Sequence, residues 1–473
     1  MKKLVIVATV LSFILAGCGT VTGKPDLNRL YAVSSSQRAQ HPVILIPGAG
    51  ASRLRRHTDG REIWPGPLTN FLFKTSDRLA LEIDPETLQP RNDNIEAYGL
   101  FDGVAGVHYY RRIRSALESA GGYSLGKPGQ RYTRDDRRYY IFLYDWRQNI
   151  PETAAQLDRL VEQIRSDYAD PSLKVDIIAH SMGGLLARYF IRYGSEDVLD
   201  SDTFHPNGVG AAKIGKVILI GTPNWGSIKG LQVFMKGKRF GLMRLYPEIL
   251  ATMPAAYELL PHPDRDWMIA LDGSKWDRDL YSVKTWRDNQ WSIFAPEAQA
   301  RIRSRFDSSN DAQRYIDVLT RYFERNLLRA KHFHRALSVP PGQAPVRYVV
   351  FGGDCTLTPA RCLVEPAKGR MRVRFHPRDV VNRVPGLNYD SLMLEPGDGT
   401  VTKPSLLARN SLDPSLPGND HTEFPIAYSV FLCERHAQLT ANLTFQDNLL
   451  NILLSQATTQ DRVHTQTIPV PPR

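Results

Sequence analysis

Short apolar runs, each stopped by a turn that contains glycine, proline or aspartate, recur along the chain. They cover residues 43–46, 139–144, 174–178, 217–220 and 346–351. Apolar positions at helical spacing follow two of them, over 154–164 and 185–191. Runs without polar alternation are typical of parallel strands that are buried on both faces. The pattern predicts an α/β fold, a mostly parallel sheet with helices on both faces.

Residues 225–340 break this rhythm. Between two predicted core strands they carry a helical pattern around Tyr315 and Phe323, and five of the chain's 7 tryptophans: Trp225, Trp267, Trp276, Trp286 and Trp291. We expect a cap insertion over 225–345, with most of these rings in its own core and a few lining a pocket. The sheet then divides into two parts, 41–224 and 346–456, and an irregular tail follows over 457–473.

The first residues read as a targeting segment. Two lysines precede an apolar stretch over 4–14, which is too short to span a bilayer and is typical of a secretion signal. The stretch ends in Leu-Ala-Gly-Cys, which resembles the bacterial lipobox, so we predict a signal peptide over 1–17 and acylation of Cys18, for example with palmitate. A plain cleavable signal with a chance cysteine is the alternative.

Lipid chains on Cys18 would anchor the protein to a membrane surface. The polar residues after it predict a flexible tether over 18–40. Gly19, rather than an aspartate, follows the cysteine, which resembles an outer-membrane address in bacteria with two membranes. We therefore expect an exported lipoprotein that faces the periplasm or the cell surface.

Charge and cysteine content narrow the classes of partner. Sixty Lys+Arg against 49 Asp+Glu give a net charge of +11. No basic segment is interleaved with stacking aromatics, so we exclude nucleic acid as a partner and interpret the charge as solvated surface that could aid adhesion to anionic lipid.

Besides Cys18 there are Cys355, Cys362 and Cys433. A Cys355–Cys362 disulfide and three thiols are both open readings, and no metal or organic cofactor is expected.

Residues 179–184, Ala-His-Ser-Met-Gly-Gly, lie between the third apolar run and a predicted helix. A small-x-Ser-x-Gly turn between a strand and a helix is typical of the nucleophile elbow of α/β-hydrolases. The two glycines would let strand and helix approach closely. We predict that Ser181 is the nucleophile. A structural turn is the alternative reading.

A serine nucleophile requires a histidine base and an orienting carboxylate, which in this fold follow in the order acid, then histidine. Asp398, between two glycines, is the predicted acid, and Asp354 the reserve. His436 is the predicted base because it lies between an apolar run and a helix with a capping pattern at Thr444 and Asp447. The other candidate histidines are His421, in a loop, and His464, in the tail; His180 should point away from the serine.

An oxyanion hole requires two backbone N–H groups that face the developing charge. Met182, directly after the nucleophile, should supply one of them. Ala49, in the turn after the first strand, should supply the other.

Several motifs occur together in the order found in one family. The chain resembles the lecithin:cholesterol acyltransferase family, which includes lysosomal phospholipase A2 and phospholipid:diacylglycerol acyltransferases. The resemblance rests on residues 41–48, 142–147, 179–184, 221–223, 254–261 and 397–401, and on His436. It implies the α/β-hydrolase fold, the triad and the oxyanion hole given above. It also implies that Asp145 and Trp146 buttress the pocket wall, with purely structural support as the alternative. The early cysteines that close a lid in animal members are missing here, and 262–340 match no family motif.

The expected function is a serine esterase or lipase that acts on phospholipid or acylglycerol esters through an acyl-serine. An O-acyltransferase that moves a phospholipid acyl group to an alcohol is one alternative. A non-catalytic lipid-binding envelope lipoprotein is another. The expected partners are a lipid ester and, through Cys18, a membrane surface.

Overall fold

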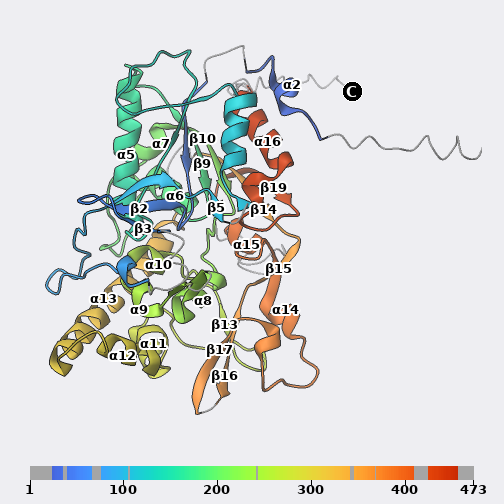
Figure 1. Cartoon of the computed structure of the whole chain (residues 1–473). Helices are drawn as coiled ribbons and strands as arrows, with labels where there is room; N and C mark the ends of the chain where they lie inside the picture. Colours follow the sequence, from blue (N-terminus) through green and yellow to red (C-terminus); the bar gives the residue numbers. More distant parts are fainter. Residues whose placement is uncertain are drawn as a thin grey trace, which may run out of the picture.

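The computed structural model describes residues 24–35, 40–66, 76–104, 107–240, 243–340, 346–367, 369–409 and 424–455. Its centre is a seven-stranded sheet of order β19-β14-β10-β9-β1-β8-β7 (Figure 1). Each pair of neighbouring strands is parallel. The strands are β1 (Val43–Ile46), β7 (Ser124–Leu125), β8 (Arg138–Ile141), β9 (Val175–His180), β10 (Ile214–Ile220), β14 (Tyr348–Gly353) and β19 (Ile426–Leu432). The predicted α/β-hydrolase class is confirmed.

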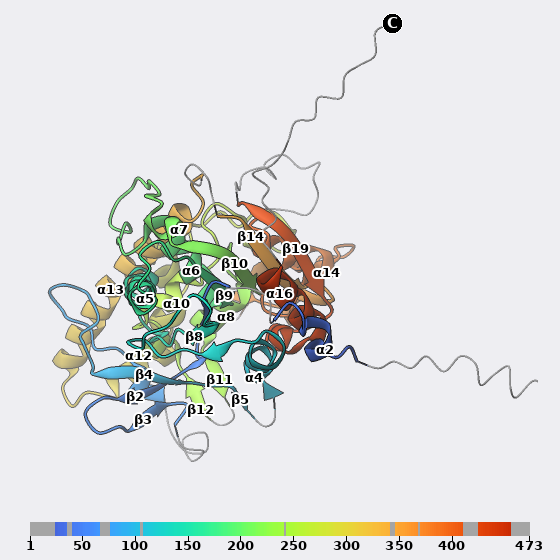
Figure 2. The ribbon, with the colours of Figure 1, turned by 90° about the horizontal axis from the view of Figure 1, so that it is seen from above.

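Helices cover both faces of this sheet (Figure 2). Along β1, Ile44 and Ile46 pack into the cluster that contains α5 (Ile150–Asp167) and α6 (Met182–Tyr193). Val43 and Leu45 pack into the opposite cluster, which contains α4 (Arg111–Ser115), the π-helical turn η3 (Ala116–Ala120) and α16 (Leu443–Leu454). Because both faces are buried, the strand sequence shows no polar alternation.

Two predicted boundaries move, each for a local reason. β8 ends at Ile141, short of residue 144, because the Tyr144 N–H donates to Ser52 Oγ at 3.2 Å rather than continuing the ladder. The last helix is capped by Asn442, whose side chain accepts from Phe445 N–H at 3.1 Å, so the cap predicted at Thr444 is wrong.

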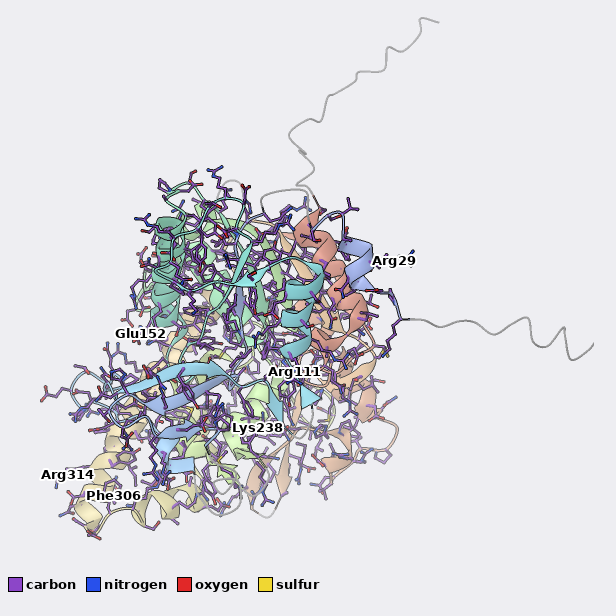
Figure 3. All side chains as sticks on the ribbon, turned by 45° about the horizontal axis from the view of Figure 1, so that its top comes forward. Arg29, Arg111, Glu152, Lys238, Phe306 and Arg314 are labelled. Carbon is purple, nitrogen blue, oxygen red and sulfur yellow. A yellow bond between two sulfur atoms is a disulfide. The ribbon has the colours of Figure 1, made fainter. Side chains whose placement is uncertain are left out.

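The segment between β10 and β14, which was predicted to be a cap, lies below the sheet in Figure 1, and we refer to it as the cap. Its described elements are α8 (Ile228–Lys236), β11 (Lys238–Phe240), β12 (Met243–Leu245), α9 (Pro247–Leu250), α10 (Pro254–Glu258), β13 (Met268–Ile269), α11 (Val283–Asp288), η4 (Ser292–Phe294), α12 (Pro296–Arg303) and α13 (Ser309–Ala336). Four of its five tryptophans are buried and Trp276 is half-buried, as expected for rings in the cap's own core. Phe306 and Arg314 mark the outer end of the cap (Figure 3).

A second excursion, between β14 and β19, was not anticipated. It contains β15 (Thr356–Pro359), β16 (Cys362–Ala367), β17 (Arg370–Arg374), η5 (Pro377–Asp379), α14 (Tyr389–Met393), β18 (Leu394–Gly397) and α15 (Lys403–Leu406). β16 pairs with β13 of the cap, Met268 opposite Cys362, so this part of the expected second core segment leaves the central sheet and joins the cap.

Smaller elements complete the described chain: β2 (Ser52–Arg56), β3 (Glu62–Trp64) and β4 (Ile95–Leu100) in one sheet, with η2 (Ser76–Leu79), β5 (Gly103–Val104), β6 (Val107–His108), α7 (Val209–Ala212) and η6 (Leu439–Ala441).

The predicted tether is interrupted by α2 (Leu27–Tyr31). Leu27 and Tyr31 pack against the cluster that contains α16, and the Tyr31 hydroxyl donates to the Asp447 carbonyl at 2.7 Å. The signal segment, Cys18 and the tail lie outside the described residues. Within the described part of the chain, no helix has both the length and the apolar character needed to cross a membrane.

Candidate active site

The sharp turn between β9 and α6 holds Ser181 with φ 54° and ψ −125°, a conformation that non-glycine residues rarely adopt. Gly183 permits the close approach that this turn requires, since a Cβ there would lie 2.7 Å from the carbonyl oxygens of Ile46 and Pro47. Turn and glycine together place the serine at the carboxyl end of β9, where sites form in parallel sheets.

Three side chains that are far apart in the sequence meet at this end of the sheet. His436 Nε2 lies 3.0 Å from Ser181 Oγ, and His436 Nδ1 lies 2.8 Å from Asp398 Oδ2. His436 occupies the loop between β19 and α16, and Asp398 directly follows β18. The structure therefore brings together the three residues that the sequence singled out, in the geometry of a serine–histidine–aspartate triad.

Asp398 is almost fully buried and is held by further hydrogen bonds. Its Oδ1 accepts from the N–H groups of Thr400 at 2.9 Å and Val401 at 2.7 Å, and its carbonyl accepts from His436 N–H at 3.0 Å. Burial by itself would raise the pKa of this carboxyl, but His436 and the two N–H donors outweigh it and hold the pKa below the ordinary value. Asp398 is therefore kept as a carboxylate beside the imidazole.

The proposed oxyanion donors lie in the turn after β1 and at the start of α6. Neither the Ala49 N–H nor the Met182 N–H has a hydrogen-bond partner among the described residues. The preceding N–H, of Gly48, is already used, because it donates to the Tyr110 hydroxyl at 2.9 Å. The Ala49 N–H thus remains a free donor in this turn, and the preceding Gly48 lies against Ser181.

The side chains of Asp145 and Trp146 both make contacts that support the fold near the site. Asp145 forms an ion pair at 2.6 Å with the fully buried Arg147. Trp146 Nε1 donates to the Ser52 carbonyl at 3.2 Å and its ring packs 5.4 Å from that of Trp64. The Trp64 Nε1 in turn donates to the Gly50 carbonyl at 2.7 Å, which links this aromatic pair to the turn that holds Ala49.

The other candidates fall elsewhere. Asp354, the reserve acid, forms an ion pair with Lys403 at 2.9 Å. His421 and His464 lie outside the described residues. The ring of His180 hydrogen-bonds to Tyr110 and to a backbone carbonyl, not to the serine. Across the described residues, no group of three His, Cys, Asp or Glu side chains could hold a metal ion.

Cys355 pairs with Cys433, and Cys362 is a buried free thiol, so the Cys355–Cys362 bridge is wrong. Proximity in the sequence suggested the wrong partner. Cys362 lies within β16, whereas Cys433 directly follows β19, three residues before His436. The position of Cys433 beside the predicted base was the feature of the sequence that could have indicated its role. No comparable signal marked Tyr110.

Comparisons with known proteins bear on the family resemblance and on the fold. The family model for lecithin:cholesterol acyltransferase matches residues 132–332. No curated protein matches the chain. Among solved structures, the crystal structure of the Tle4-Tli4 complex is 14% identical, with a TM-score of 0.53, over 88% of this chain and 98% of that one. At this identity the likeness concerns the fold alone.

Two bacterial enzymes align more loosely. Bacillus licheniformis lipase BlEst2 in its mature form is 11% identical, covering 89% of this chain and 94% of that one, with a TM-score of 0.29. EstA from Clostridium botulinum is 13% identical, covering 91% of each chain, with a TM-score of 0.34. These scores are too low to carry an argument. The resemblance seen in the motifs is confirmed over 132–332, where this α/β-hydrolase chain is similar in sequence to the lecithin:cholesterol acyltransferase family.

Proposed function

We propose that this protein is a serine-dependent lipid esterase that works through an acyl-serine on Ser181. The observation that carries the proposal is the hydrogen-bonded series from Ser181 Oγ through His436 to Asp398 at the carboxyl end of a parallel sheet. Such a series turns a weakly nucleophilic hydroxyl into one whose proton has a base to receive it.

The reaction would proceed in two halves. His436 Nε2 takes the Oγ proton as the serine oxygen attacks the acyl carbonyl, and the N–H groups of Ala49 and Met182 bind the oxyanion. The protonated imidazole then gives its proton to the oxygen of the departing alcohol, and the acyl group remains on Ser181 as an ester. Water attacks this ester, loses a proton to His436, and the carboxylic acid departs as Oγ recovers its proton. Asp398 holds Nδ1–H throughout, which keeps Nε2 free to accept.

The class of substrate rests on the family match, because lecithin:cholesterol acyltransferase takes its name from an acyl donor that is a phospholipid. The same match favours a second candidate function, acyl transfer. If an alcohol instead of water enters the second half-reaction, identical groups produce a new ester. The acyl donor would then be a phospholipid or acylglycerol in either case.

The deciding experiment incubates the full-length protein with dioleoyl phospholipid, with and without a long-chain alcohol, and follows fatty acid and new ester by mass spectrometry. A Ser181→Ala variant is the control. Serine-dependent fatty acid alone identifies an esterase, and new ester in excess of fatty acid identifies an acyltransferase. Serine-independent products, or none even from short-chain esters, would overturn the proposal in favour of a lipid-binding lipoprotein.

We also propose that the mature chain is anchored to a membrane through acylated Cys18, on the support of the lipobox-like Leu-Ala-Gly-Cys sequence. Labelling of expressing bacteria with radioactive palmitate should mark the wild-type protein and not a Cys18→Ala variant. Membrane fractionation should move the variant to the soluble fraction. Equal labelling of both proteins would contradict the anchor without affecting the proposal for Ser181.

A further inference from the structure

His180, the residue before the nucleophile, is a buried titratable group that the proposed mechanism does not use. Its Nδ1 lies 2.8 Å from the Tyr110 hydroxyl, and its Nε2 lies 3.3 Å from the backbone carbonyl of His436. The Tyr110 hydroxyl also accepts the N–H of Gly48 at 2.9 Å. Gly48, Tyr110 and His180 are buried, and with the backbone carbonyl of His436 they form one hydrogen-bonded chain beside Ser181.

The chemistry of the two ends fixes the direction of every bond in this chain. The Gly48 N–H can only donate and the His436 carbonyl can only accept. The Tyr110 oxygen therefore accepts from Gly48 and gives its own proton to His180 Nδ1. The neutral imidazole then carries its proton on Nε2, which donates to the carbonyl, and each of these groups is satisfied.

Burial keeps the side chains of this hydrogen-bonded series uncharged. The pKa of His180 falls to about 3, first because the ring is desolvated and then because it lies close to His436; the carbonyl of His436 and the charge of Asp398 act in the opposite direction. Burial also raises the pKa of the Tyr110 hydroxyl. His180 therefore adds no positive charge next to His436, whose ring centroid is 5.0 Å away.

This chain of hydrogen bonds connects four segments at the site. Gly48 precedes Ala49 in the turn after β1, and Tyr110 directly precedes α4. His180 ends β9, and His436 belongs to the loop after β19. Close contact supports the connection, since a Cβ on Gly48 would lie 2.9 Å from the Cβ of Ser181. In contrast to buried Tyr110, its neighbour Arg111 lies at the surface (Figure 3).

We propose that Tyr110 and His180 are positioning residues that fix the turn of the oxyanion donor and the loop of the base relative to Ser181. The inference rests on the proposed function of Ser181. Without the Tyr110 hydroxyl, Gly48 N–H loses its acceptor and His180 Nδ1 loses its donor. His180 can then adopt the other tautomer, in which its Nε2 lone pair faces the His436 carbonyl and repels it. The loop that carries the base would shift away from the serine.

The test replaces one oxygen atom, Tyr110→Phe, and measures kcat and KM with a water-soluble short-chain ester together with thermal unfolding. We expect kcat to fall on the order of 10- to 100-fold with KM nearly unchanged, because misplacement of reacting groups acts on the chemical step. Tyr123→Phe is the matched control. Tyr123 lies in the same buried cluster, and its hydroxyl has no hydrogen-bond partner among the described residues. This control should keep the wild-type kcat.

A second variant, His180→Gln, keeps an amide able to donate and accept. The double variant with Tyr110→Phe should lose no more activity than the worse single variant, because the two residues act as one unit. A folded Tyr110→Phe protein with wild-type kcat, or strictly additive losses, overturns the inference. If Ser181→Ala is inactive in the same assay, such a result leaves the proposed function intact; if Ser181→Ala stays active, the proposed function itself fails.

Discussion

Different interactions stabilise the carboxyl edge of the central sheet and the cap beneath it. At the edge, Asp398 alone takes part in five hydrogen bonds, with lengths from 2.7 to 3.1 Å. In the cap, the ring of Phe323 lies among those of Phe234, Trp286 and Phe294, with centroids 5.3 to 5.6 Å from its own. The structure of the edge depends on directional hydrogen bonds, and the structure of the cap depends on close packing of aromatic rings.

This contrast predicts how each region responds to change. A hydrogen bond to a charged or catalytic group sets where one atom lies, so its loss acts mainly on the chemical step. A buried aromatic ring contributes apolar area and contact without direction, so its loss acts mainly on stability. Substitutions at the edge should therefore change kcat in a folded protein, and substitutions in the cap should change unfolding with the triad intact.

The largest effect is expected at the edge, from Asp398→Asn. The amide oxygen can still accept from Thr400 and Val401, but the amide nitrogen then faces His436 Nδ1 as a donor. The imidazole must move its proton to Nε2 and can no longer accept from Ser181. We expect kcat for a soluble ester to fall about 10⁴-fold.

The control for this loss is Asp354→Asn, since Asp354 pairs with Lys403 at a partly exposed site. Its kcat should stay within about twofold of the wild type, because such ion pairs contribute little. Thermal unfolding of both variants shows whether they are folded. A larger loss from Asp354→Asn than from Asp398→Asn would show that the acid has been misassigned.

The next largest effect, a loss of stability, is expected in the cap from Trp286→Ala. Trp286 is fully buried, and its ring lies 5.5 Å from that of Phe234 and 5.3 Å from that of Phe323. The cavity should cost about 3–5 kcal/mol in the free energy of unfolding. The rate at which a phosphonate labels Ser181 should hardly change in the folded protein.

Denaturant unfolding measures this cost, and hydrogen exchange over 283–336 locates it. Trp276→Ala, at a half-buried ring of the same cap, is the milder control and should cost less. Slow phosphonate labelling in a folded Trp286→Ala protein would show that the cap and the edge are coupled.

How far the sequence predicts each region follows from the same contrast. β1, β9 and β10 are mostly apolar runs that end in turns, so local pattern was enough to find them within a few residues. His436 could be placed by chain order, as the histidine between the last strand and the last helix. These features depend on neighbouring residues, which a single sequence displays directly.

Features that depend on distant pairing could not be found in this way. Tyr110 meets His180 and Gly48 across 70 and 62 residues, and no motif surrounds it. The β13–β16 pairing links β16 and β17 to the cap, although they lie between two strands of the central sheet. For the last helix, the pattern at Thr444 looked sufficient, but Asn442 lies within reach of Phe445 N–H and takes the cap.

The disulfide joins the ends of two neighbouring strands, β14 and β19, at the carboxyl edge of the sheet, so its removal should lower both kcat and stability moderately. Cys355 lies after β14 and Cys433 precedes His436, 78 residues apart. Cys355→Ser/Cys433→Ser should lose about 2–4 kcal/mol of stability, because the unfolded chain regains freedom. Reductant should lower the unfolding temperature of the wild type and leave that of the double variant unchanged. An equal response of the two proteins would mean that the bridge does not form, and Cys362→Ser controls for loss of a thiol.

An effect of pH on stability, with no effect on the triad, is expected where the cap meets the core, at Glu258. This α10 carboxyl is buried, and both of its oxygens lie within hydrogen-bond distance of Ile150 N–H at the start of α5, at 3.2 and 2.9 Å. Burial raises its pKa to about 8, although the Ile150 N–H and Arg329 act to lower it. In the unfolded chain the same carboxyl ionises near its ordinary value of 4.5.

Between these two pKa values the folded protein holds a proton that the unfolded chain has released, so its stability falls as the pH rises. The contribution of Glu258 is complete below the unfolded pKa and is lost by the time the pH passes the folded one. Glu258→Gln has nearly the same shape and does not titrate, so its unfolding temperature should decline less across that window. The difference between the two curves cancels the other titrating groups. Parallel curves would mean that Glu258 is ionised in the folded state, and that the junction of cap and core holds a buried charge instead of a neutral acid.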